Sequence, residues 1–283
     1  MGVNLYQAEN NNDNLIKEVF VFFDFLKTPP VLDEESVQWQ FDLFEWALRN
    51  FDADIFFNKT ILVEPSNQYF PGEANSTGEM AQLIFDKVRD YAALKHWPCR
   101  LTTQQSCAAQ PPRIVVSGVL RNMQGVEPED VAEEDRLVIL YDPRQVTNPE
   151  AIIATFAHTL AHHLGSMSKD MPPGGEDNWP HTTEVLAVFL GFGLMFANSA
   201  FVYRNVTCGS CKPATVNRNA WLSQYDITYS LAIFCVLKDI PVKKALKNIK
   251  KSLRPYFKKA YKDVKKYQSE LERLRNLETK ALA

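Results

Sequence analysis

The chain has 283 residues, of which 46% are hydrophobic and 23% are charged, and its formal net charge is −3. This length and apolar content are enough to bury a substantial core, as one large domain or two closely packed lobes, and they exclude a mostly disordered chain. Five cysteines in a chain of this length also exclude a small disulfide-framework protein.

The N-terminus is polar. Residues 1–14 are rich in asparagine and lack the basic stretch and apolar run of a secretory signal, so we expect a cytoplasmic protein.

The first lobe, about residues 15–147, is predicted to contain both helices and strands. Its expected elements are an amphipathic helix over 33–49, a strand at 60–63, a helix over 77–94, and strands at 113–119 and 136–141.

A clear helix start opens the second lobe, about residues 148–268, which is predicted to be mainly helical. Asn148 is a capping residue, Pro149 suits the first helical position, and Glu150 places an acid in the first turn. We expect this helix to end at Gly165. Four of the five histidines lie within this helix or soon after it.

Two of these histidines have the spacing of metal ligands. His158 and His162 are four residues apart and therefore project from one face of the helix. This is the arrangement in the zinc metallopeptidase motif H-E-x-x-H, whose glutamate activates the zinc-bound water. Thr159 stands at the position of that glutamate, and a threonine hydroxyl cannot replace a carboxylate as a general base. His163 lies about 100° further round the helix, outside the ligand face.

A second helix is expected from His181 to about Ala200, after a polar loop rich in proline and glycine. Residues 185–203 carry no formal charge, and a run of this length could cross a membrane. The run contains two glycines and Asn198, and it lacks flanking anchors on one side. We therefore predict a buried helix at the centre of the fold and no membrane span.

These motifs together resemble a known family. The stretch Phe156–His162, preceded by Asn148–Glu150 and followed by Thr183–Gly193, resembles bacterial H-E-x-x-H proteins of the zincin superfamily. The similarity covers about residues 60–257, including Pro65–Pro71. The resemblance implies an α+β, zincin-like fold: a small sheet, an active-site helix, and a second helix that supplies the third ligand. It implies no substrate.

Carried over position by position, the resemblance makes His158 and His162 the two zinc ligands. Glu184 falls at the acidic position of the second helix, and His181 lies near the place of the third ligand. Two sites therefore remain open: three histidines backed by Glu184, or two histidines and Glu184 itself. Glu176 and Glu184 are the carboxylates that could act as a substitute base.

The C-terminal part of the chain has the strongest charge asymmetry. Residues 238–266 hold twelve Lys and Arg against two Asp, a balance of +10 that leaves −13 for the rest. Apolar residues recur there every three or four positions, which predicts a helix packed on the core. The charges could bind phosphates, an anionic membrane or an acidic face of the same protein. We expect a solvated basic face that stabilises the fold, with the acidic remainder as its counter-surface, and no nucleic-acid role.

Two functional classes follow. The first is a pseudo-peptidase, in which a zincin scaffold keeps one zinc ion and binds a peptide or protein partner. The second is a metal-dependent hydrolase with an unorthodox base. A further alternative is a metal-free structural or binding protein. We expect the first.

Overall fold

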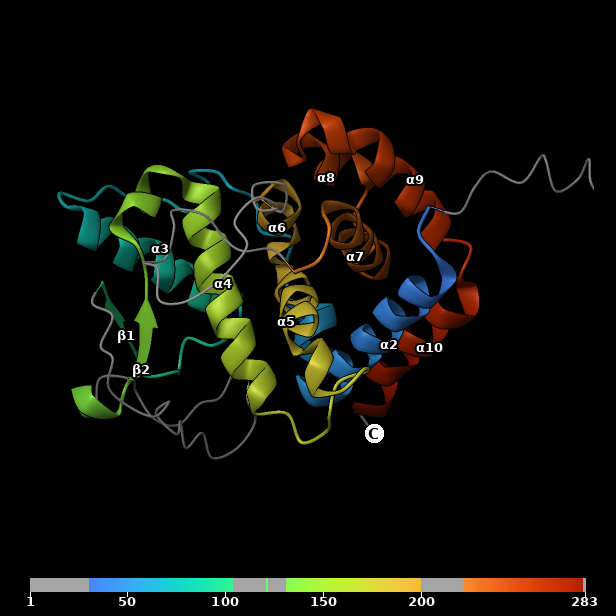
Figure 1. Ribbon diagram of the computed structural model, residues 1–283, viewed down its shortest axis with the longest axis horizontal. Coiled ribbons are helices and arrows are strands. Elements are labelled where there is room, and N and C mark those ends of the chain that lie inside the picture. The colour runs from blue at the N-terminus through green and yellow to red at the C-terminus, as the bar shows by residue number, and fades with distance from the viewer. Residues whose placement is uncertain (1–30, 104–120, 122–130, 200–220, 282–283) are drawn as a thin grey trace, which may run out of the picture.

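The computed structural model describes residues 31–103, 121, 131–199 and 221–281. The strand predicted at 113–119 and the polar residues 1–14 lie outside the described residues. The helices are α2 (Glu34–Asn50), α3 (Thr77–Tyr91), α4 (Pro149–Ser166), α5 (Trp179–Ala187), α6 (Gly193–Ser199), α7 (Gln224–Leu237), α8 (Val242–Asn248), α9 (Arg254–Val264) and α10 (Gln268–Ala281). The strands are β1 (Cys99–Thr102) and β2 (Leu137–Leu140), so the described residues form a mainly helical α+β fold with a small sheet (Figure 1).

The two described strands pair in parallel, with Cys99 opposite Leu137 and Thr102 opposite Leu140. Strand β2 confirms the strand predicted at 136–141. Strand β1 was not predicted, because its four residues are all half-buried and show no alternation of apolar and polar positions.

Helix α4, which carries three of the histidines, lies between α3 on one side and α5 and α6 on the other (Figure 1). Its start is as predicted. The Asn148 side chain accepts a hydrogen bond from the Ala151 amide at 3.3 Å, and Pro149 occupies the first turn. The cap and the packing on both sides hold the histidines on a rigid element.

Gly165 does not end α4, which continues to Ser166. The glycine instead permits close packing of α5 on α4. A Cβ atom at this position would lie 3.3 Å from Leu186 Cδ2 and 3.3 Å from Trp179 Cζ2. The predicted helix end is therefore wrong by a short margin, because a glycine needed for helix contact was interpreted as a C-terminal signal.

The single helix predicted from His181 to about Ala200 is also wrong, because the structure divides it into α5 and α6. A π turn at Val188–Phe192 joins them, and Gly191 has φ 101° and ψ 1°, outside the helical region. The Gly191 carbonyl accepts a hydrogen bond from the Val63 amide at 3.0 Å. The segment 60–63, which was predicted as a strand, does not join the sheet. It packs instead against the bend at Gly191 between α5 and α6.

Residues 176–199 are long and apolar enough to span a membrane by length and composition alone. However, 94% of their most apolar window is buried inside the protein. Phe189, Leu194 and Phe196 are among the side chains that lie fully in the core. This burial agrees with the prediction of a central buried helix.

The basic segment forms two helices, α8 and α9, where one was predicted. Ile249 has extended backbone, and α9 has Pro255 in its first turn. Proline lacks an amide hydrogen and clashes with the carbonyl four residues earlier, so one continuous helix cannot run through it. The predicted apolar stripe packs on the core. Four of its members are buried, Ile249, Leu253, Phe257 and Val264. The other three, Ile240, Leu246 and Tyr261, are partly buried against the core.

The expected acidic counter-surface for this segment is found in part among the described residues. Burial raises the pKa of the Glu150 carboxyl, and the charge of Lys250 acts on the same carboxyl to lower it. Asn248 donates a hydrogen bond to Glu64 at 2.7 Å. Lys266 pairs with Asp263 of its own segment, at 2.9 Å. Within the described part of the chain, no ion pair joins a lysine of α8 or α9 to an acid outside residues 238–266. The segment is therefore held by its apolar stripe together with hydrogen bonds, such as the one from the Lys250 amide to Asn198 at 3.0 Å.

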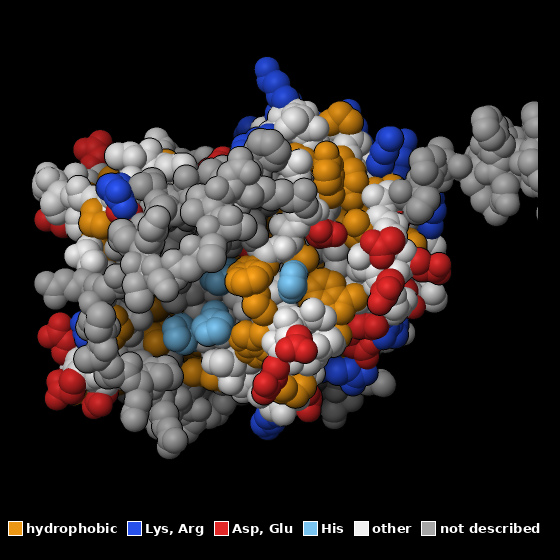
Figure 2. Space-filling view, in the orientation of Figure 1, with side chains coloured by type: hydrophobic (Ala, Val, Ile, Leu, Met, Phe, Trp, Pro, Cys, Tyr) orange, Lys and Arg blue, Asp and Glu red, His pale blue; other side chains and the backbone are white. Residues whose placement is uncertain are grey.

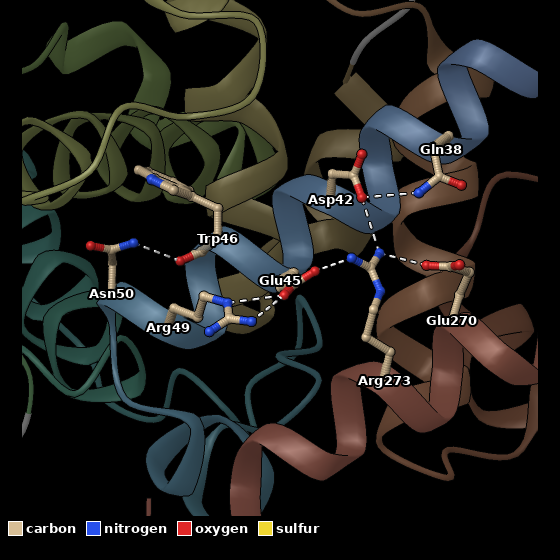
Figure 3. A network of polar contacts seen from close by, with 8 residues as sticks. All are labelled: Gln38, Asp42, Glu45, Trp46, Arg49, Asn50, Glu270 and Arg273. Atoms are coloured by element: carbon tan, nitrogen blue, oxygen red, sulfur yellow. Dashed lines mark hydrogen bonds and ion pairs between the residues drawn. The ribbon is translucent and has the colours of Figure 1, made fainter. Parts of the chain in front are cut away.

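Helix α10 packs on α2 through a charged cluster (Figure 3). The Arg273 guanidinium of α10 contacts Asp42 at 3.0 Å and also pairs with Glu45, both on α2, and with Glu270 of its own helix. Leu271 on the same helix is buried. The last helix therefore closes back onto the first described one.

One hydrophobic core contains side chains from both predicted lobes. The Phe56 ring stacks on Phe189 with centroids 4.5 Å apart, and it meets Phe234 edge-on at 5.6 Å. These three rings come from the first lobe, the π turn and α7. The two predicted lobes thus pack against each other without a separating linker in the described residues.

Candidate metal site

The ligand-type histidines lie in the C-terminal half of α4. The His158 side chain is half-buried and the His162 side chain is exposed, so the face that they share reaches the surface. His162 and its neighbour His163 have ring centroids 5.5 Å apart. Figure 2 shows histidine side chains gathered over α4, and another over α5.

The environment keeps two of these rings neutral. Burial lowers the pKa of His162 below its ordinary value, even though part of its ring is exposed. Burial, with a smaller effect of the nearby His162, lowers the pKa of His163 to about 4. Neutral imidazole is the form that binds metal ions. At neutral pH, protons therefore compete little for His162.

Thr159 is engaged with the main chain of its own helix. Its hydroxyl donates a hydrogen bond to the Thr155 carbonyl at 3.0 Å. Threonine hydroxyls commonly bond in this way within helices. The side chain at the motif's general-base position thus donates to the backbone. A threonine hydroxyl is also too weak a base to take a proton from water at neutral pH.

Glu184 is the most deeply buried acid of the predicted site, with 0% of its surface exposed. Its two carboxylate oxygens accept the main-chain amides of Trp221 at 3.2 Å and Leu222 at 2.9 Å. Amide donors of this kind stabilise a buried carboxylate. Glu184 therefore fastens α5 to the chain just before α7.

His181 lies one turn before Glu184 and contacts the same segment. Its ring meets the Trp221 ring edge-on, with centroids 6.2 Å apart. The His181 Nδ1 atom is buried and has no hydrogen-bond partner among the described residues. A buried ring nitrogen without a partner is unusual, because such atoms normally make a hydrogen bond or bind a ligand.

Glu176, the other predicted substitute base, is exposed in the 3₁₀ turn Glu176–Asn178. Its carboxylate makes no hydrogen bond or ion pair within the described part of the chain. The structure therefore places it on the polar loop between α4 and α5, with no contact that ties it to the histidines.

The predicted site residues form two groups. One is the histidine pair on α4, and the other is His181 with Glu184 on α5, at the segment 221–222. Within the ranges that the structure describes, no three His, Cys, Asp or Glu side chains are grouped so that they could hold a metal ion. By their spacing on the helix, His158 and His162 could supply two ligands of one ion. The described residues do not bring a third ligand beside them.

Trp221 and Leu222 were not predicted to belong to this region. They contribute main-chain amides, which no side-chain motif indicates. One signal lay nearby: Ser223 and Asp226 form a capping box at the start of α7. A capping box fixes the start of a helix, so the main chain just before it is held in place. The Trp221 and Leu222 amides can therefore donate to a buried carboxylate.

Comparison of the chain with protein-family models, with curated proteins and with solved structures finds no match. The resemblance to the zincins therefore stays a prediction that depends on the residues themselves.

Proposed function

We propose that the chain is a zincin-like protein with an impaired hydrolytic centre, which keeps a histidine site for one divalent metal ion, zinc, and binds a peptide or protein. The observation that carries this proposal is the state of α4. Its two ligand-type histidines share a face that reaches solvent, while Thr159, at the base position, donates to the Thr155 carbonyl. The pair of ligands is kept and the base is absent.

Of the two third ligands that the sequence left open, we infer that His181 suits the role better than Glu184, although the described residues do not group it with the pair on α4. Its Nδ1 lacks a hydrogen-bond partner among the described residues, whereas both Glu184 oxygens accept amides. Glu184 then acts as a positioning residue, because it fixes the helix that carries His181. A zinc ion at such a site would polarise a bound water or carbonyl group.

The first prediction concerns metal content. Protein purified without chelators should hold about one zinc ion per chain, and His158→Ala or His162→Ala should each weaken zinc binding by more than about 100-fold. His163→Ala is the matched control, since this neighbouring ring lies on another face of α4 and should leave zinc content unchanged. Metal analysis by mass spectrometry and zinc titration measure both. A metal-free native protein whose zinc uptake is unaffected by the two substitutions would contradict the proposal.

The second prediction concerns hydrolysis. The native protein should cleave unstructured peptides negligibly, and Thr159→Glu should raise chelator-sensitive cleavage by about 10²–10⁴-fold, the usual contribution of general-base catalysis. Thr159→Gln introduces a side chain of the same shape as glutamate without the base, and it should stay inactive. Cleavage of a fluorogenic peptide library measures all three proteins. Robust cleavage by the native protein that also persists in Glu176→Gln and Glu184→Gln would show an active hydrolase with another base.

A further inference from the structure

The outer side of α8 and α9, with the turn between them, carries a dense group of lysines, which we call the lysine face. Its members are all exposed: Lys243, Lys244, Lys247, Lys251, Lys258, Lys259 and Lys262. None of them makes an ion pair within the described residues. Figure 2 shows Lys and Arg side chains along the surface over these helices.

The fold keeps this charge pointing outward. Phe257, Ala260 and Val264 on the opposite side of α9 are buried, so the helix cannot rotate its lysines inward. The one acid of α9, Asp263, accepts the Tyr229 hydroxyl at 2.9 Å and pairs with Lys266. It therefore does not neutralise the lysine face.

The remaining acid of the basic segment is engaged elsewhere as well. The Asp239 carboxylate forms an ion pair with the Arg275 guanidinium of α10 at 3.2 Å. The seven lysines thus make no ion pair within the described residues, on a protein whose total charge is −3. A field of this kind attracts an anionic partner over roughly a Debye length, about 8–10 Å at physiological salt.

We propose that the lysine face docks the protein on a bilayer that contains anionic phospholipids. Clusters of about four to eight basic residues on an amphipathic helix are typical of such surfaces, because each ammonium group gains from the negative potential of the leaflet. The apolar stripe of α9 is occupied by the core, so the contact is electrostatic and peripheral, without insertion of this helix.

The side chains favour a lipid surface over a nucleic acid. Proteins usually bind nucleic acids through arginine guanidinium groups, which contact phosphates in pairs of hydrogen bonds, and through aromatic side chains that stack on the bases. Here the single arginine of the segment, Arg254, donates to the main-chain carbonyls of Ile249 and Lys247. The α9 tyrosines point their hydroxyls inward, Tyr256 to the Val31 carbonyl and Tyr261 to that of Ile240. Only lysine ammonium groups remain, and these point charges on flexible stems suit a fluid layer of headgroups.

The test uses the full chain and sedimentation with vesicles of phosphatidylcholine, with and without phosphatidylserine. The chain should bind only vesicles with phosphatidylserine, and added salt should release it. The triple variant Lys258→Gln, Lys259→Gln, Lys262→Gln should lower the partition coefficient by about 100-fold. The matched control changes three exposed lysines elsewhere, Lys59→Gln, Lys95→Gln and Lys169→Gln, and should bind like the native chain.

Three results would overturn the proposal. One is no binding of the native chain to phosphatidylserine vesicles at low salt. Another is an equal loss in both triple variants, which would assign binding to net charge alone. The last is salt-sensitive binding of duplex DNA or RNA without vesicle binding, which would assign the lysine face to nucleic acid. Circular dichroism of both variants, expected to match the native spectrum, excludes unfolding as the cause of a loss.

Discussion

Gly191→Ala is expected to destabilise the protein by roughly 3–5 kcal/mol, a large share of the stability of an ordinary domain. The residue has φ 101°, where a side chain is strained. A Cβ atom would also lie 2.2 Å from the Ile61 carbonyl oxygen, which belongs to the backbone and cannot simply rotate away. The hydrogen bond from the Val63 amide to the Gly191 carbonyl holds the two segments at this distance. Chemical denaturation followed by circular dichroism measures the change.

Two glycine variants separate the strain from the collision. Gly175 has φ 66° and ψ −157°, a backbone conformation that is largely restricted to glycine, and a Cβ atom there would meet nothing within 4 Å. Gly175→Ala should therefore lose about 1–3 kcal/mol, from backbone strain alone. Gly78 lies in α3, where the nearest atom would be the Tyr141 hydroxyl at 3.9 Å, and Gly78→Ala should be neutral or stabilise by up to about 1 kcal/mol. If Gly191→Ala proved as mild as Gly175→Ala, the close approach of segment 60–63 to the bend would be wrong.

The bend matters for the candidate site because it sets the direction of α5. That helix carries His181 and Glu184, and Gly165 lets it lie close against α4. A continuous helix through Gly191 would move one half away from its neighbours. A strained glycine in the core thus supports the packing of α5 beside the helix that carries the histidine pair.

Local signals in the sequence predicted the elements whose cause is local. Asn148 caps α4 as expected, because a capping side chain and the amide that it accepts are neighbours in the chain. The i, i+4 spacing of His158 and His162 likewise fixes their shared face once a helix forms. These features depend on a few adjacent residues.

Features that depend on distant contacts were not predicted correctly. The bend at Gly191 was not predicted, because nothing nearby in the sequence indicates that the Ile61 carbonyl oxygen lies where a side chain would be. Strand β1 exists through its pairing with β2, which lies far along the chain. The amide partners of Glu184 are 37 and 38 residues away in sequence. The sequence left the third ligand open for the same reason, since its choice depends on how α5 sits against α4.

Truncation after Leu237 is the second large effect, and it should abolish cooperative folding. The removed part contributes large apolar side chains to the core, among them Leu253, Phe257, Val264, Leu271 and Leu274. Burial of a large apolar side chain stabilises by about 1.5–3 kcal/mol, and a domain of ordinary stability has only about 5–15 kcal/mol in total. The cut also exposes the α7 surface that α9 covers and removes the Arg273 cluster on α2. Soluble yield and a thermal melt monitored by circular dichroism measure the outcome.

The lysine-face triple variant is the matched control for the truncation, because it removes charge from α9 and leaves the apolar stripe in place. It should melt like the native chain, so that loss of folding in the truncated chain reports packing rather than charge. A truncated chain that is soluble and melts cooperatively would show that α8–α10 are an appendage with their own role.

Packing and lipid docking are otherwise compatible, because they use opposite sides of α9: Phe257 and Val264 face the core, and Lys258 and Lys262 face outward. The stripe then holds the lysines in a fixed array, which is the condition for a charged surface to bind through several headgroups at once.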